Sequence, residues 1–292
     1  MNPDTSACPL CGARSAEARF SERGFQLVQC RECELFYINP YPIDAAETHE
    51  TVATYDYAEL EIVDPQRHYR SSQRYYERYF DWLEPELVSA RRVLDVGCGT
   101  GRLLELLGAR ENLHREGIEL NKQRAAFSRS VAACPVHEVP LEELDPETPF
   151  DVLFMMNVLS HVSQLEPFFA AIRQVMTDDG RLVMKVGEMD GRVKKSAVND
   201  WSLPDHLHFL GLNTIDVLAD RFGFHVARHQ REPLSWEIFA KEAWVAPGRS
   251  RLRNMIKRTV VSIPYTLPAM RKVYDAVHGD TIFTSLVVLV PK

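Results

Sequence analysis

The sequence lacks three features that would assign it to a familiar class of protein. None of its apolar runs approaches the roughly 20 residues that a membrane-spanning helix needs. Residues 1–10 are polar and lack the apolar core of a secretory leader, so we expect a cytoplasmic protein. Basic residues are not in excess, since 34 Lys and Arg stand against 41 Asp and Glu, a net charge of −7. Proteins that bind nucleic acid through its phosphates are usually basic, so a nucleic-acid partner is not expected.

Cysteine is also scarce, yet four of the six cysteines form two C-x-x-C pairs, Cys8 with Cys11 and Cys30 with Cys33. Two such pairs with eighteen residues between them have the spacing of a four-thiolate zinc site. The intervening stretch is typical of a hairpin. Two disulfides are the alternative, which a reducing cytosol disfavours. We therefore predict a small zinc ribbon over residues 1–40, with a structural Zn²⁺ because four thiolates close its coordination shell.

Glycine is infrequent, with 14 in 292 residues, but three glycines lie between positions 97 and 101. They follow the apolar run 93–96, which predicts a buried strand, and precede a helical segment that begins at Arg102. Glycines in such a turn let the backbone come close to a ligand. Arg102 stands where the dinucleotide pattern G-x-G-x-x-G has its third glycine. The segment therefore predicts a nucleotide-type pocket at the carboxyl end of a sheet, but not a dinucleotide fingerprint.

Strand and helix patterns alternate from this turn to the end of the chain. We expect strands over 92–96, 115–119, a short stretch at Val136, 150–157, 181–186, a strand opening at 223 and a last one over 281–290. We expect helices over 66–88, 102–109, 122–132, 167–176 and 213–222. The run 150–157 is too apolar to have a solvent-exposed face, so we expect it in the middle of the sheet. The pattern predicts an α/β fold, a Rossmann-like sheet with helices on both faces.

Residues 93–102, with Asp95 two residues before the first glycine, resemble the first motif of class I S-adenosylmethionine (SAM)-dependent methyltransferases. In that family a carboxylate after the second strand binds the ribose, and Glu119 stands at this place. Residues 157–162 are similar to the fourth motif, and the cysteine pairs resemble the zinc ribbon of a branch that includes deoxysugar C-methyltransferases. The resemblance implies that SAM is bound by Asp95, Gly97, Cys98, Gly99, Gly101, Glu119, Leu120 and Asn157.

The same resemblance points to three catalytic candidates, His161, His206 and His208. His206 stands where the branch has the histidine of a Glu-His motif, although Asp205 replaces the glutamate and residues 210–211 depart from the usual aromatic and serine. Imidazole titrates near neutral pH and suits a general base. We predict His206 as the base, with Asp205 and His208 as helpers and His161 as the next candidate. A purely structural role is the alternative for each histidine.

We divide the chain into three parts. Residues 1–40 are the zinc ribbon, residues 41–88 a linker and an aromatic helix, and residues 89–292 a methyltransferase domain with a helical insertion at about 231–280. Within the insertion, residues 249–263 form a basic amphipathic segment. An anionic substrate, a partner, a membrane surface and a solvated helix are all compatible with this segment.

Together these features predict methyl transfer from SAM to a small-molecule acceptor, such as a sugar or a natural-product intermediate. One alternative is an RNA methyltransferase whose ribbon grips RNA, which the acidic balance disfavours. The other is a SAM-binding scaffold without catalysis, which the intact Asp95, glycine turn and Glu119 disfavour. Oxygen, nitrogen and carbon acceptors all fit the sequence, and no oligomeric state is implied.

Overall fold

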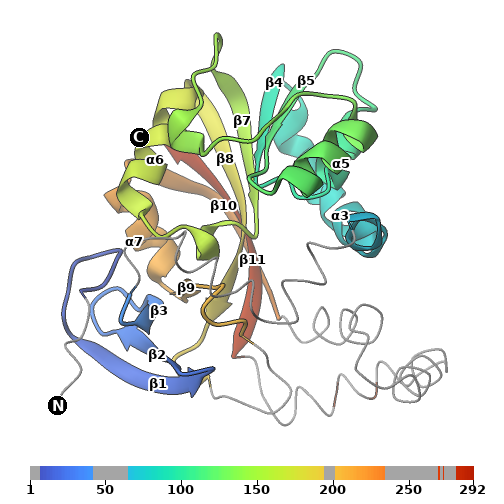
Figure 1. Cartoon of the computed structure of the whole chain (residues 1–292). Coiled ribbons are helices and arrows are strands. Elements are labelled where there is room, and N and C mark those ends of the chain that lie inside the picture. The colour runs from blue at the N-terminus through green and yellow to red at the C-terminus, as the bar shows by residue number, and fades with distance from the viewer. Residues whose placement is uncertain (1–6, 42–64, 194–200, 234–268, 270–271, 273–280) are drawn as a thin grey trace, which may run out of the picture.

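The structure is a computed structural model of the whole chain, and it describes residues 7–41, 65–193, 201–233, 269, 272 and 281–292 (Figure 1). Its centre is a sheet with the strand order β6-β5-β4-β7-β8-β11-β10. The strands are β4 (Arg92–Val96), β5 (His114–Ile118), β6 (Val136–His137), β7 (Phe150–Met156), β8 (Met176–Met189), β10 (Phe224–Pro233) and β11 (Ile282–Pro291). Strands β4 to β8 pair in parallel, whereas β11 runs antiparallel to β8 and β10. The apolar β7 lies in the middle, as predicted.

Helices cover both faces of this sheet (Figure 1). They are α3 (Pro65–Leu87), α4 (Arg102–Leu107), α5 (Lys122–Ala132), α6 (Leu165–Val175) and α7 (Thr214–Arg221), with the 3₁₀ turns η1 (Leu141–Glu143) and η2 (Leu159–His161). On one face, α3 and α4 bury Leu83 and Leu103 in the same cluster as Val93. On the other, α6 buries Phe169 with Leu94. The predicted α/β class is confirmed, and none of the described helices has the length and apolarity of a membrane crossing.

The N-terminal residues form a second, smaller sheet, which we call the four-cysteine module (residues 7–41). Its strands are β1 (Ala16–Glu22), β2 (Phe25–Cys30) and β3 (Phe36–Asn39), and the hairpin predicted between the cysteine pairs is β1–β2. Strand β3 pairs with β9 (His208–Gly211), and β9 pairs in parallel with the last two residues of β8. The module is therefore joined to the central sheet through hydrogen-bonded strands, and one cluster of buried side chains runs through both.

Several predicted bounds are wrong, and those of two neighbouring elements differ most from the structure. The strand expected over 181–186 is β8, which extends from Met176 to Met189. It begins directly after α6, with an irregularity over 177–180, because Met176 already pairs with Phe150 of β7. It runs on at its far end because its last residues pair with both β9 and β11. The helix expected over 167–176 accordingly begins two residues earlier and ends at Val175.

Several predicted segments fall outside the described residues. They include most of the linker after residue 41 and the basic amphipathic segment 249–263. Residues 231–233 of the predicted insertion belong to β10, and nearly all of the remainder is likewise not described. The aromatic helix predicted over 66–88 is α3, which confirms that element.

Candidate functional site

The turn between β4 and α4 passes through Gly97, Gly99 and Gly101, which have left-handed φ angles of +69°, +56° and +78°. This region strongly favours glycine. A Cβ on Gly97 would lie 2.6 Å from a methyl group of Val158, and one on Gly101 would overlap the hydroxyl of Ser128. A Cβ on Gly99 would meet no atom of the described residues within 4 Å. Two of the glycines therefore allow close packing, whereas Gly99 leaves its backbone open to a ligand.

Asp95, near the end of β4, is a buried carboxylate. Its side chain is 1% exposed, and its Oδ2 has no hydrogen-bond partner among the residues that the structure describes. Burial, and then the negative charge of Glu119, raise the pKa of Asp95 well above its usual range. An uncompensated buried carboxylate is costly, and buried polar atoms normally have partners. The position therefore fits a site at which a cationic ligand group supplies the missing partner.

Glu119 directly follows β5 and connects that strand to the glycine turn. Its two oxygens accept hydrogen bonds, each 2.9 Å long, from the backbone N–H groups of Gly99 and Asn121. The next side chain, Leu120, is 58% exposed and offers an apolar surface beside the carboxylate. Cys98 is buried in the cluster between α4 and α5, so only its backbone is available to a ligand in the turn.

The end of β7 packs against the same turn. Asn157 follows β7 with a φ of +67°, its side chain is exposed, and its N–H donates to the carbonyl of Lys185 at 3.0 Å. Val158, whose side chain approaches Gly97, precedes η2, and η2 ends at His161. Because parallel strands end at one edge of a sheet, β4 and β7 bring the predicted cofactor residues and one predicted catalytic histidine to the same edge.

Two of the three predicted catalytic histidines lie side by side, with the ring centroids of His161 and His206 4.8 Å apart. Nδ1 of His161 donates to the backbone carbonyl of Asp205 at 3.0 Å, and the Asp205 carboxylate lies 3.3 Å from the same nitrogen. Nδ1 of His206 donates to the carbonyl of Trp201 at 2.9 Å. Asp205, predicted to help His206, therefore contacts His161. With Nδ1 acting as donor in both rings, Nε2 is the nitrogen that carries the lone pair.

The third histidine, His208, lies in the joint between the two sheets. It begins β9, is 1% exposed, and its Nδ1 lies 3.2 Å from the hydroxyl of Tyr41. Burial lowers the pKa of His208 to about 3, so its ring is neutral in the folded protein. Trp201 has no functional signal in the sequence, because it acts through a backbone carbonyl that any residue type possesses.

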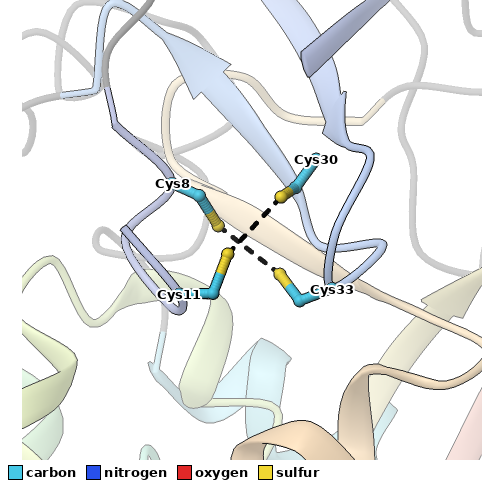
Figure 2. Close-up of side chains that lie close together, drawn as sticks. All are labelled: Cys8, Cys11, Cys30 and Cys33. Carbon is cyan, nitrogen blue, oxygen red and sulfur yellow. Dashed lines mark hydrogen bonds between the residues drawn. The ribbon is translucent and has the colours of Figure 1, made fainter. Parts of the chain in front are cut away.

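Figure 2 shows the four cysteine side chains of the module pointing toward a common centre. The Sγ atoms of Cys8 and Cys33, and those of Cys11 and Cys30, are 3.5 Å apart. A disulfide bond is only about 2.05 Å long, so these thiols are unbridged. Sulfurs held tetrahedrally about 2.3 Å from one Zn²⁺ would be about 3.8 Å apart, so the cluster fits that ion. The hydrogen bond between Cys8 and Cys33 lowers the pKa of Cys8 to about 6 and raises the pKa of Cys33 well above its usual range, so in the metal-free cluster the Cys33 thiol donates to a Cys8 thiolate. A bound metal would replace that shared proton.

Comparisons with known proteins agree with this geometry. A family described as a methyltransferase domain matches residues 66–229, more than half of the chain. A tRNA U34 carboxymethyltransferase of Shewanella woodyi is 35% identical over 124 residues, which are 40% of this chain and 37% of that protein. A ubiquinone biosynthesis O-methyltransferase of Rhodopseudomonas palustris is 30% identical over 97 residues, 32% of this chain and 38% of its own. The chain thus spans less than two fifths of the length of these curated relatives.

The fold is also found in solved structures. The chain is similar to a mycolic acid cyclopropane synthase solved with SAH, with a TM-score of 0.54 and 15% identity, covering 73% of this chain and 82% of that one. At this identity the likeness concerns the fold alone. The family match covers α3, the glycine turn, Glu119 and the histidine of η2. The chain therefore belongs to the class I methyltransferase family, and it carries a four-cysteine cluster on a sheet that extends the family's central one.

Proposed function

We propose that this chain transfers a methyl group from SAM to a small-molecule acceptor, such as a sugar or a natural-product intermediate. The observation that carries the proposal is the buried Asp95, whose Oδ2 has no partner among the described residues, beside a glycine turn that is open at Gly99. SAM supplies an electrophilic methyl group on a sulfonium and also has a cationic amino group. Asp95 offers the negative charge that such a ligand would neutralise.

The neighbouring residues support the same ligand. Glu119 is the proposed acceptor of hydrogen bonds from the ribose hydroxyls, and its contacts with Gly99 and Asn121 hold it in place. The exposed Leu120 is the proposed apolar contact of the adenine ring. The backbone of Gly97, Cys98, Gly99 and Gly101 is the proposed lining of the methionine side. Asn157 at the end of β7 completes the proposed cofactor set.

On the acceptor side, His206 is the proposed general base. Its Nδ1 donates to the carbonyl of Trp201, which fixes the ring, and Nε2 is the proposed proton-accepting atom. His161, held by Asp205 next to it, is the second candidate for this step. His208 is buried against Tyr41 and has the proposed role of supporting the loop from within the joint.

The tRNA-modifying relative favours a second candidate function, transfer to an RNA base. The net charge of −7 weighs against it, because phosphate contacts need Lys and Arg. Binding of bulk tRNA, titrated against salt, separates the two functions. A small-molecule enzyme should bind tRNA weakly, whereas an RNA enzyme should bind tightly and lose affinity steeply as salt increases.

We propose that the four-cysteine cluster holds one structural Zn²⁺. The unbridged sulfurs, 3.5 Å apart across the cluster, support this ion. Four thiolates leave no open coordination position, so the ion stabilises the module and takes no part in methyl transfer. Reduced thiols also favour the cytoplasm as the compartment of the protein.

The test of the main proposal has two stages. Calorimetry should first detect SAM binding by the purified chain. The protein is then incubated with methyl-labelled SAM and pooled metabolites, and mass spectrometry identifies the small molecule that gains the label. Absence of both SAM binding and a labelled product would overturn the proposal. His206→Ala should lower turnover by about 10²–10⁴-fold with SAM affinity unchanged, whereas the exposed His225→Ala should have no effect.

A further inference from the structure

We propose that His161, Asp205 and His206 form a second metal site, which binds a divalent transition-metal ion and presents it to a hydroxyl of the acceptor. One ligand atom from each of the three side chains lies within 4.8 Å of the other two. Two imidazoles and one carboxylate are a common ligand set for such ions. All three side chains are half-buried, so the cluster is not sealed inside the core.

The orientation of both imidazoles favours metal binding. In each ring Nδ1 donates to a backbone carbonyl, that of Asp205 for His161 and that of Trp201 for His206. Metal-ligating histidines usually donate their other ring nitrogen to a carbonyl or carboxylate, which fixes the ring and makes the ligating nitrogen more basic. Here those outer contacts exist for both rings, and the ring centroids are 4.8 Å apart. One nitrogen of each imidazole and one carboxylate oxygen of Asp205 are the proposed metal ligands, and Nε2 is the nitrogen that the Nδ1 contacts assign to this role. The Asp205 carboxylate lies 3.3 Å from Nδ1 of His161, so binding of the ion would move it from that nitrogen to the metal.

The number of ligands suggests what the ion does. Four cysteines close the coordination shell in the module, but three protein ligands leave a position open, as in catalytic metal sites. The cluster lies one turn of η2 beyond Val158, which packs on Gly97 of the glycine turn. His161, and with it the cluster, is therefore on the same edge of the sheet as the proposed cofactor site. An oxygen of the acceptor is the ligand that fits this place.

This inference rests on the proposed function and refines its acceptor step, because metal binding uses the Nε2 of His206 that would otherwise take a proton. Coordination lowers the pKa of a bound hydroxyl, whose proton passes to solvent water. The oxygen lone pair then forms the new C–O bond while the C–S bond of SAM breaks and its electron pair stays on sulfur. The acceptor class is thus a hydroxylated small molecule that is methylated on oxygen.

The experiment uses the full chain with the module loaded with Zn²⁺ and titrates Co²⁺ alone by calorimetry. We expect one further Co²⁺ site, whose absorption lacks the intense bands of sulfur ligation. His206→Ala and the near-isosteric Asp205→Asn should each weaken Co²⁺ binding by at least the roughly 10–100-fold that loss of an outer-shell partner costs. His225→Ala is the matched control and should bind Co²⁺ normally. Acetohydroxamate, a small oxygen chelator, should change the Co²⁺ spectrum by entering the open position.

Three results would overturn the inference. They are a chain that binds no Co²⁺ beyond the module, a site that persists in both ligand variants, and a spectrum that acetohydroxamate leaves unchanged. SAM affinity, measured on the same samples, reports on the proposed function separately. A protein that binds SAM but no second metal loses only the metal site and keeps His206 as the base. A protein that binds Co²⁺ but no SAM keeps the site and loses the proposed function.

Discussion

At the scale of single residues, Asp95 illustrates a conflict between stability and ligand binding. Its carboxyl group is buried near Glu119, so the fold raises its pKa. The proton that the group holds in the folded state is lost more readily when the chain unfolds. A carboxylate with these properties destabilises the ligand-free protein. Its negative charge would be balanced by a cation that binds beside it.

Asp95→Asn should therefore stabilise the ligand-free chain, increasingly so at higher pH. The folded pKa lies above the unfolded value of about 3.9, so the stability of the natural protein falls as pH rises through the folded pKa, whereas Asn does not titrate. Thermal unfolding should show a larger advantage of the variant at about pH 8 than at about pH 5. SAM affinity should fall, since a hydrogen bond to a charged group contributes about 1.5–3 kcal/mol. The exposed Asp145→Asn is the control, and equal pH profiles would contradict this account.

Glu119→Ala should weaken SAM binding by about 1–3 kcal/mol, because two ribose hydroxyls lose a charged acceptor. The same change removes the acceptor of the Gly99 and Asn121 N–H groups. Glu119→Gln keeps an acceptor and should fall between the natural protein and the alanine variant. Calorimetry with SAM measures the series, with the exposed Glu147→Ala as a control. Unchanged affinity in Glu119→Ala would remove this residue from the cofactor site.

At the scale of elements, different glycines of the turn between β4 and α4 have different roles. Gly101 allows close packing, and Gly99 leaves space for a ligand. Gly101 meets Ser128 of α5, which comes from another part of the chain. Gly99 has open space beside its Cα among the described atoms. Both have positive φ, so alanine strains either position, but only one of the two substitutions also forces a collision.

Gly101→Ala should consequently destabilise the fold more than Gly99→Ala does. Backbone strain costs about 1–2 kcal/mol at each position, and the overlap with Ser128 adds about 1–3 kcal/mol at Gly101 alone. Gly99→Ala should instead lose more SAM affinity than its small loss of stability explains, because the methyl group occupies the open space. Denaturant unfolding and SAM calorimetry on both variants check this contrast. Equal destabilisation of the two would argue against the packing described here.

An element can be predicted from the sequence when the residues that determine it are close together in the chain. β4, β7 and the turn after β4 were predicted correctly because apolar runs and glycines are visible within a few residues. The length of β8 was not, since its ends are set by pairing with Phe150 and with β9 and β11. The contact of His161 with Asp205 likewise depends on how a loop returns to the sheet, which no spacing in the sequence encodes.

At the scale of the whole molecule, the four-cysteine module supports the loop that carries His206. Backbone N–H groups of Trp201 and Leu203 donate to the buried carboxylate of Glu22 at the end of β1, at 3.3 and 3.2 Å. The ring of Trp201 packs against Phe20 of the same strand, with centroids 5.5 Å apart. Because His206 donates to the Trp201 carbonyl, the module positions this histidine indirectly.

Loss of the Zn²⁺ proposed for the module should therefore reduce methyl transfer without weakening SAM binding. Elemental analysis should find about one tightly held Zn²⁺ per chain, and Cys30→Ser should lose it together with much of a folding contribution on the order of 10 kcal/mol. The module should melt before the main domain, and turnover should fall because the loop at Trp201 loses its support. Cys134→Ser lies outside the cluster and should keep both zinc and activity. A zinc-free Cys30→Ser protein with normal turnover would show that the loop at Trp201 keeps its conformation without support from the module.

The four-cysteine module also covers an edge of the short strand β9. It has only four residues, and it is covered on one side by the tip of β8 and on the other by β3. Without β3, its row of peptide groups would face water, and an uncovered strand edge is a template for other chains. We therefore expect the four-cysteine module to prevent β9 from pairing with other chains. A truncated chain that lacks it should form soluble oligomers or precipitate during expression, whether or not its cofactor site remains intact.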